Sequence, residues 1–290
     1  MKCYLCGATT RFYLKKNGYM IYRCDSCGLA RTELNQQYDS FLAEQYNKGY
    51  FTGDLSRGAY INYKEDKPFI IRNMRKFLAE IKKVKPRGKL LEVGCAMGFF
   101  VEIALKAGYD AYGFDPSDYA VDNAVKLNGD TRIKRGNISS VEYPAESFDV
   151  IALFDVFEHL GDPRRDLRKL FSLLKKDGII IIATGDTEST AAKILGRRWT
   201  FYIPPQHLFF FNRQTLTTLL NKEDLIPYRW FRIGKWLSLR YVLHLARTTG
   251  ESRFASWLYD IVKAFKLGMF PLYLSMQDNM VVIAQKKNHA

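Results

Sequence analysis

The feature that most constrains the fold is a strand-like run, a glycine turn and a helix-like run in immediate succession. Residues 89–93 are apolar enough for a short buried strand, and residues 99–106 have the apolar spacing of a helix that ends at Gly108. The turn between them contains Gly94 and Gly98. A strand that passes through glycines into a helix directs backbone N–H groups toward one point, and glycine has no Cβ to hold a ligand away. The segment predicts an α/β fold with an elongated cofactor across this turn.

Residues in and beside the turn indicate the kind of ligand. The dinucleotide pattern G-x-G-x-x-G would need glycine at Ala96 and Phe99, and neither position has it. Glu92 lies at the end of the strand, just before the first glycine, where a carboxylate suits a cationic ligand better than a pyrophosphate. An ordinary turn in another doubly wound protein is the alternative that this segment alone leaves open.

Apolar runs after the turn continue the alternation of strands and helices. A carboxylate, Asp115, ends the second strand about 20 residues after the glycines, where an acid binds the ribose hydroxyls in doubly wound folds. This series of elements favours a doubly wound α/β sheet. The further strands are expected at residues 110–114, 131–135, 148–154, 179–183, 227–233 and 280–284.

Composition is that of a globular protein, with 47% hydrophobic and 26% charged residues among 290. No run approaches the roughly 18 apolar residues of a membrane span, and the N-terminus lacks a signal-like segment, so we expect a cytoplasmic protein. The net charge of +14 favours polyanionic partners such as nucleic acid, anionic lipid or phosphorylated sugars without choosing among them. A basic protein without such a partner is the alternative.

Four of the five cysteines lie in the first 35 residues, in two C-x-x-C pairs that are each followed by glycine. This spacing is typical of a zinc ribbon, in which two thiolates from each pair bind one metal. Segments 12–14 and 19–22 predict a hairpin around Asn17 and Gly18, and so small a unit needs a metal to fold. Disulfides or an iron site are the alternatives. The expected ligands of a structural Zn²⁺, which leave no open position for chemistry, are Cys3, Cys6, Cys24 and Cys27.

The glycine turn, Asp115 and the segment 154–160 together resemble the class I S-adenosylmethionine-dependent methyltransferases. The first motif of that family is an acid followed by Gly-x-Gly-x-Gly, and Ala96 here replaces the middle glycine. The resemblance covers roughly residues 88–220 and the final strand. It implies a Rossmann-like, seven-stranded, mostly parallel sheet, with the last strand antiparallel between the fifth and sixth, and S-adenosylmethionine as the methyl donor.

The same resemblance implies where the donor lies. Asp115 would bind the ribose, Asn137 would accept from the adenine amino group where the family usually has an acid, and Asp155 would lie at the amino-acid end beside the methyl group. The expected donor-binding residues are Glu92, Gly94, Cys95, Ala96, Gly98, Asp115, Pro116, Asn137, Ile138, Phe154 and Asp155.

Two segments carry candidates for a general base. His207 lies in an irregular aromatic segment, residues 196–211, between a proline pair and a phenylalanine run, and an imidazole can take a proton near pH 7. Glu158 and His159 follow the fourth strand and are the other catalytic candidates. A structural histidine that holds the loop is the alternative reading of His207.

The chain divides by composition into three parts: a zinc ribbon at 1–35, a helical lid or linker at 36–86 and a methyltransferase core at 87–290. Tyr50 and Phe51 are candidates for the lid. A helical insertion at about 234–275, before the last strand, combines basic, aromatic and amphipathic character. It would contact an anionic membrane surface as a peripheral attachment, cover the substrate, or pack on the core with a solvated basic face.

A zinc ribbon on such a core resembles two groups: bacterial methyltransferases of cell-surface polysaccharide and deoxysugar pathways, and ribosomal RNA guanine methyltransferases. Trp199 and the segment 206–209 resemble the first group. We therefore expect O-methylation of a small-molecule or glycan acceptor, which could be nucleotide- or lipid-linked. C-methylation is disfavoured because there is no room for the further C-terminal domain of the deoxysugar C-methyltransferases. An RNA methyltransferase and a non-catalytic binding module on the same fold are the alternatives.

Overall fold

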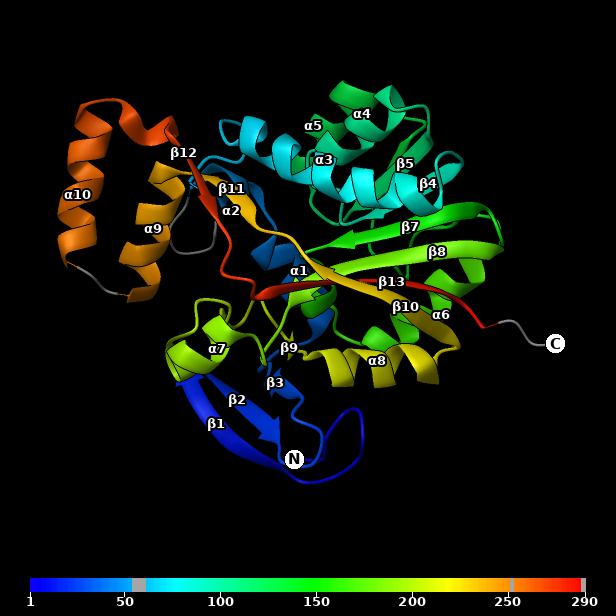
Figure 1. Ribbon diagram of the computed structural model, residues 1–290, viewed down its shortest axis with the longest axis horizontal. Coiled ribbons are helices and arrows are strands. Elements are labelled where there is room, and N and C mark those ends of the chain that lie inside the picture. The colour runs from blue at the N-terminus through cyan, green and yellow to red at the C-terminus, as the bar shows by residue number, and fades with distance from the viewer. Residues whose placement is uncertain (54–60, 251–252, 288–290) are drawn as a thin grey trace.

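A seven-stranded sheet forms the centre of the computed structural model, which describes residues 1–53, 61–250 and 253–287 (Figure 1). The strand order is β10-β13-β8-β7-β4-β5-β6, and β13 runs antiparallel to both of its neighbours while the other pairings are parallel. The predicted fold class is therefore confirmed, including the antiparallel insertion of the last strand. The strands are β4 (Lys89–Val93), β5 (Asp110–Asp115), β6 (Ile133–Arg135), β7 (Phe148–Phe154), β8 (Leu174–Gly185), β10 (Leu225–Arg232) and β13 (Asn279–Lys286).

Apolar side chains on both faces of the central strands explain why helices cover the sheet on both sides. In β7, Val150 packs in the cluster on one face and Ile151 in the cluster on the other, as expected for a period of two. In Figure 1, α3, α4 and α5 lie above the sheet, and α6 and α8 lie below it. These helices are α3 (Lys67–Val84), α4 (Phe99–Lys106), α5 (Asp118–Asn128), α6 (Pro163–Leu173) and α8 (Arg213–Lys222).

Strand β8 is longer than the sequence pattern predicts. The basic residues before Gly178 are typical of a last helical turn, but α6 ends at Leu173 and the strand begins at once. Leu174 pairs with Phe148 of β7, so the charged residues that follow belong to an extended segment rather than to a last helical turn. Charged residues at the end of a strand and at the end of a helix look alike in sequence.

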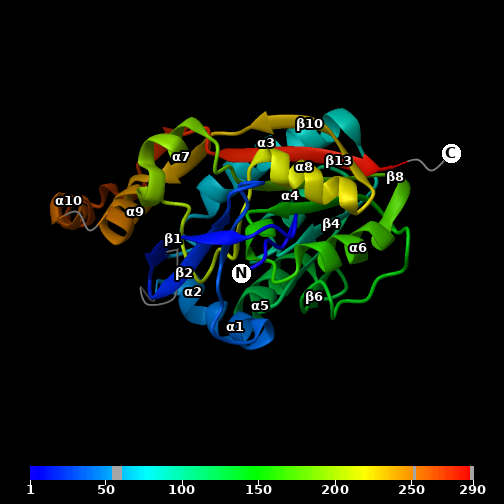
Figure 2. The ribbon, with the colours of Figure 1, turned by 90° about the horizontal axis from the view of Figure 1, so that it is seen from below.

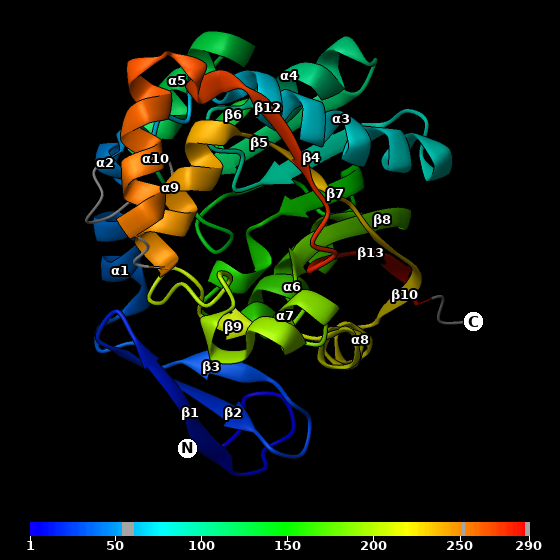
Figure 3. The same cartoon turned by 60° about the vertical axis from the view of Figure 1, so that its left-hand side comes forward.

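The N-terminal ribbon (residues 1–35) lies on the side of the sheet that α6 and α8 cover (Figure 2). Its predicted hairpin turns at Asn17 and Gly18, which have φ angles of 50° and 82°, as a two-residue hairpin loop requires. The ribbon sheet is completed by β9, in which Phe210 pairs with Ala30, and Figure 3 shows β9 beside β3. A two-residue strand has no periodicity, so the sequence could not predict this pairing. The strands are β1 (Thr10–Lys16), β2 (Tyr19–Cys24), β3 (Ala30–Thr32) and β9 (Phe209–Phe210).

The insertion before β13 contains helices, as predicted, and also a strand pair that was not predicted. Trp236 and Leu237 lie within the range that was predicted to be helical, but they belong to β11, which pairs antiparallel with β12. None of the helices in the described ranges is both long and apolar enough to cross a bilayer. The remaining elements are α1 (Tyr38–Gln45), α2 (Lys48–Thr52), η1 (Phe157–His159), α7 (Thr190–Leu195), η2 (Gly196–Arg198), β11 (Lys235–Ser238), α9 (Leu239–Gly250), α10 (Arg253–Ala264), η3 (Leu267–Met269) and β12 (Pro271–Leu274).

Candidate active site

A cavity of about 570 Å³ lies at the carboxyl ends of β4, β5 and β7, where α/β sheets bind their ligands. Helices α1, α2, α3 and α9, strand β11 and the segment before β9 contribute to its other walls. The two lid candidates, Tyr50 and Phe51, also line it. Of the predicted donor-binding residues, all but Gly98 line this cavity, and so do all three catalytic candidates.

The glycine turn has the conformation that a ligand-binding turn needs, although its middle glycine is alanine. Ala96 has φ of 46°, and its N–H donates to Asp115 Oδ2 at 2.8 Å, so the carboxylate stabilises this conformation. A Cβ on Gly98 would lie 2.4 Å from Asn128 Nδ2. Close packing of α4 against α5 therefore explains Gly98, which does not line the cavity.

Asp115 joins the turn to the second strand. Its other oxygen, Oδ1, accepts from the N–H of Ser117 at 2.9 Å, so the carboxylate is fixed by the backbone on both sides. Burial raises the pKa of Asp115 to about 6, against the lowering effect of these two hydrogen bonds. Near neutral pH the group is ionised and has lone pairs directed at the cavity, as the binding of a ribose diol requires.

Several buried polar side-chain atoms in the cavity wall have no hydrogen-bond partner within the described part of the chain. They include Glu92 Oε2, Glu158 Oε1 and Asn279 Oδ1. A buried polar atom without a partner costs free energy, so its presence in a binding cavity points to a polar ligand. S-adenosylmethionine has an ammonium group, an adenine amino group and two ribose hydroxyls, and it fits this wall.

Asp155 occupies a strained position directly after β7. Its φ of 53° lies in the left-handed region, and two side chains from the far end of the sequence hold its carboxylate. Lys235 Nζ donates to Oδ2 at 2.7 Å, and Asn279 Nδ2 donates to Oδ1 at 2.8 Å. Burial works against ionisation, but Lys235 outweighs it and lowers the pKa of Asp155.

Sequence reasoning missed Lys235 and Asn279. Asn279 begins β13, and because that strand is antiparallel, its first residue lies at the carboxyl edge of the parallel strands. The predicted topology could therefore have identified Asn279. Lys235 begins β11, which no sequence pattern revealed.

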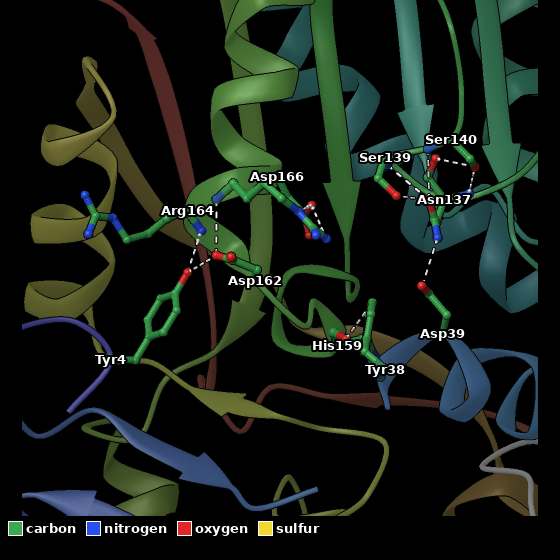
Figure 4. Close-up of polar contacts among 11 residues, drawn as sticks. Tyr4, Tyr38, Asp39, Asn137, Ser139, Ser140, His159, Asp162, Arg164 and Asp166 are labelled. Carbon is green, nitrogen blue, oxygen red and sulfur yellow. Dashed lines mark hydrogen bonds and ion pairs between the residues drawn. The ribbon is translucent and has the colours of Figure 1, made fainter. Parts of the chain in front are cut away.

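Asn137 lies at the edge of the cavity, but its side chain is already engaged (Figure 4). Its Oδ1 accepts from the N–H groups of Ser139 at 3.1 Å and Ser140 at 3.0 Å, and its Nδ2 lies 3.5 Å from Asp39 Oδ1. The expected acceptance from an adenine amino group would have to share this oxygen. Ile138 beside it is buried and lines the cavity with an apolar side chain.

Glu158, His159 and His207, which all line the cavity, meet in one cluster. Each offers a nitrogen or oxygen that can bind a proton or a metal, and these atoms lie within 4.8 Å of one another. Thr184 Oγ1 donates to Glu158 Oε2 at 2.7 Å. Burial, and then the neighbouring Asp155 carboxylate, raise the pKa of Glu158 to about 8. Three side chains that were separate candidates in the sequence thus form one cluster.

Hydrogen bonds to carbonyl groups orient both imidazoles. His207 Nδ1 lies 2.6 Å from the Phe201 carbonyl, which can only accept, so Nδ1 carries the proton and Nε2 has the lone pair. His159 Nδ1 lies 2.8 Å from both the Gln206 carbonyl and the Tyr46 hydroxyl. Burial lowers the pKa of His159 and lowers that of His207 well below its ordinary value. Both rings are therefore neutral near pH 7, so the Nε2 lone pair of His207 is available, although burial makes this nitrogen a weaker base than a free imidazole.

The four ribbon thiols lie close together, with all Sγ atoms within 4.8 Å of one another. The Sγ atoms of Cys3 and Cys27 are 3.6 Å apart, and those of Cys6 and Cys24 are 3.5 Å apart. A tetrahedron with Zn–S bonds of about 2.3 Å has edges of about 3.8 Å, so this spacing fits a Zn²⁺ ion. The four thiols are not joined in disulfides.

Comparison with known proteins agrees with this geometry. The family model of a methyltransferase domain matches residues 63–225. The chain is 26% identical over 176 residues to a ubiquinone biosynthesis O-methyltransferase of Ruegeria pomeroyi, which covers 53% of this chain and 71% of the relative. It is 27% identical over 162 residues to phosphoethanolamine N-methyltransferase 3 of Arabidopsis thaliana, covering 53% of this chain but 30% of that relative.

Solved structures share the fold at low sequence identity. A 1,6-didemethyltoxoflavin-N1-methyltransferase of Burkholderia thailandensis, crystallised with that compound and S-adenosylhomocysteine, superposes with a TM-score of 0.52 at 16% identity. The match covers 96% of this chain and 99% of that one. Since the family model covers more than half of the chain and the sheet has the expected strand order, the protein belongs to the methyltransferase-domain family and is a class I S-adenosylmethionine-dependent methyltransferase.

Proposed function

We propose that the protein transfers a methyl group from S-adenosylmethionine to an oxygen of a small organic acceptor. The observation that carries this proposal is one continuous cavity that is lined both by the glycine turn and by the Glu158–His159–His207 cluster. A donor across the turn and an acceptor hydroxyl at the cluster would meet beside Asp155.

The protein has two tasks in this reaction: it aligns the acceptor oxygen with the methyl group, and it removes one proton from the acceptor. S-adenosylmethionine, when bound, supplies a methyl carbon on a positively charged sulfur; the acceptor oxygen forms a bond to that carbon as the carbon–sulfur bond breaks, which leaves S-adenosylhomocysteine. His207 Nε2 takes the hydroxyl proton, and the Phe201 carbonyl holds the ring in the required tautomer. Glu158 adjoins this pair and, when neutral, can pass a proton onward.

The walls of the acceptor end favour a compact acceptor with an apolar or aromatic face. Aromatic rings line much of the cavity, which suits stacking on a planar molecule. The relatives named above act on small molecules, as their names state, and this supports the same class here. The lining rings are those of Tyr38, Tyr46, Tyr50, Tyr63, Phe201, Trp236 and Tyr241.

The predicted link to polysaccharide or deoxysugar pathways stays a prediction, because none of the relatives named above is a polysaccharide or deoxysugar enzyme by its name. The predicted peripheral membrane contact also stays a prediction. Exposed apolar side chains in the insertion support it, because such side chains beside Lys266 suit an anionic bilayer surface. They are those of Phe265, Leu267 and Phe270. Sedimentation with anionic and with neutral vesicles would test it: equal pelleting with both would count against an electrostatic contact.

Transfer of labelled methyl groups from S-adenosylmethionine to a panel of acceptors tests the proposed function. The panel contains small phenols and other small hydroxyl compounds, nucleotide-sugars, lipid-linked sugars and ribosomal RNA. We expect label on small hydroxyl compounds. Label on RNA alone, with steeply salt-dependent binding, would assign the chain to the alternative class.

A further inference from the structure

The ribbon and the segment that carries His207 are joined by buried hydrogen bonds. Thr32, the last residue of β3, is almost fully buried, and its hydroxyl donates to the backbone carbonyl of His207 at 2.7 Å. The N–H of Thr32 donates to the carbonyl of Leu208 at 2.9 Å, and the pairing of β3 with β9 continues this contact. Two successive carbonyls of this segment, those of His207 and Leu208, are thus held by one ribbon residue.

A second part of the ribbon holds the same segment from its other end. Asn17, in the hairpin turn, donates through Nδ2 to the carbonyl of Pro204 at 2.9 Å. A shared apolar cluster fills the space between these two hydrogen bonds. It combines Leu14, Ile21 and Ala30 of the ribbon with Trp199, Tyr202 and Phe210.

The ribbon is itself anchored to the core, so it can act as a rigid support. Tyr4 hydrogen-bonds to Asp162 and accepts from the N–H of Arg164 at 2.9 Å, at the start of α6 (Figure 4). Lys222, at the end of α8, donates to the carbonyl of Leu5 at 2.7 Å. These anchors lie beside the cysteines, whereas Thr32 and Asn17 reach the His207 segment.

We propose that Thr32 is a positioning residue for His207, and that the metal-bound ribbon is in this way a structural part of the acceptor end of the active site. This inference rests on the proposed role of His207 in methyl transfer. The ring of His207 is held within its own segment by Phe201, but the backbone that carries the ring is held by the ribbon. Loss of the Thr32 hydroxyl leaves the buried His207 carbonyl without this donor and lets the imidazole move relative to the donor methyl group.

Three substitutions in the ribbon, two at Thr32 and one control, test the proposal. Thr32→Val keeps the shape and the β-strand backbone but removes the hydroxyl, and we expect kcat to fall about fivefold to tenfold with an unchanged Kd for S-adenosylmethionine. Thr32→Ser restores the hydroxyl and should restore kcat. Thr10→Val is the matched control, because the Thr10 hydroxyl donates to Met1 in the ribbon and contacts nothing in the active site.

A double-mutant cycle separates positioning from a general loss of stability. If Thr32 acts through His207, Thr32→Val should have no further effect on kcat in the His207→Ala background. Equal falls in both backgrounds, or an unchanged kcat in Thr32→Val alone, would overturn the inference while leaving His207 as a base. An unchanged kcat in His207→Ala would instead overturn the proposed role of His207 and the inference with it.

Asn17→Gly provides a second variant in case Thr32→Val does not fold. Glycine suits the positive φ of this exposed turn, so the hairpin should form while the hydrogen bond to Pro204 is lost. We expect a smaller fall in kcat, about twofold to threefold, again with an unchanged Kd for S-adenosylmethionine. An unaltered kcat in this well-folded variant would show that the ribbon does not position the segment through its hairpin.

Discussion

The two ends of the cavity are built in different ways. The glycine-turn wall of the donor end comes from one stretch of chain in which Glu92, Ala96 and Asp115 lie within 24 positions of one another, and Ala96 hydrogen-bonds to Asp115. The acceptor end is assembled from segments far apart in the sequence: Tyr46 and His159 are 113 residues apart, and Thr32, which hydrogen-bonds to His207, is 175 residues from it. A site made of local structure should tolerate changes elsewhere, whereas a site made of distant segments depends on the packing of the whole molecule.

The largest expected effect is at the donor end. Asp115→Ala removes both the ribose-binding carboxylate and the hydrogen bond that holds Ala96 at positive φ, so we expect the Kd for S-adenosylmethionine to rise at least about a hundredfold. Calorimetric titration measures it. Asp118→Ala, three residues later and on the surface, is the matched control and should bind normally. Near-normal binding by Asp115→Ala would break the assignment of the donor end.

At the acceptor end, His207→Ala should lower kcat by at least about a hundredfold, because the proton acceptor is lost. The Kd for S-adenosylmethionine should stay within about twofold, since His207 contacts no residue of the glycine turn. Single-turnover kinetics and calorimetry separate the two quantities. A parallel loss of donor affinity would show that the two ends are not independent.

The smallest expected effect is on stability rather than on rate. The raised pKa of Glu158, about 8, means that the folded protein keeps a proton that the unfolded chain releases above its ordinary value near 4.5. Stability therefore falls as pH rises between these values, by up to about 1.4 kcal/mol per pH unit for one proton. Asp115 contributes in the same sense only up to about pH 6. The lowered pKa values of the two histidines act in the opposite sense: they make stability rise with pH, but only below the ordinary histidine pKa of 6.5.

Glu158→Gln should flatten this dependence between about pH 6.5 and 8, because glutamine has no proton to release. Denaturant unfolding of both proteins across this range measures it. If the free energies of unfolding of the two proteins changed with pH by the same amount, Glu158 would be ionised in the folded protein. That result would remove its proposed part in passing a proton onward.

The same contrast explains what could be predicted from the sequence. The sheet, the glycine turn and Asp115 were predictable because strand and helix periodicity and a fixed spacing carry the information locally. The convergence of His159 with His207 was not, because nothing in either segment encodes the other. Lys235 was missed since its strand, β11, forms only by pairing with β12 at the far end of the insertion. The division of the chain into three parts remains a prediction.

The pairing of β3 with β9 has a consequence for how the chain folds during synthesis. The N-terminal sheet lacks its fourth strand until Phe209 and Phe210 have been synthesised, 177 residues after Thr32 in the case of Phe209. During that interval the edge of β3 is open, and a chain shortened before position 209 would leave it so permanently. We therefore expect the N-terminal unit produced alone to associate with itself through this edge, and the full-length chain to protect it.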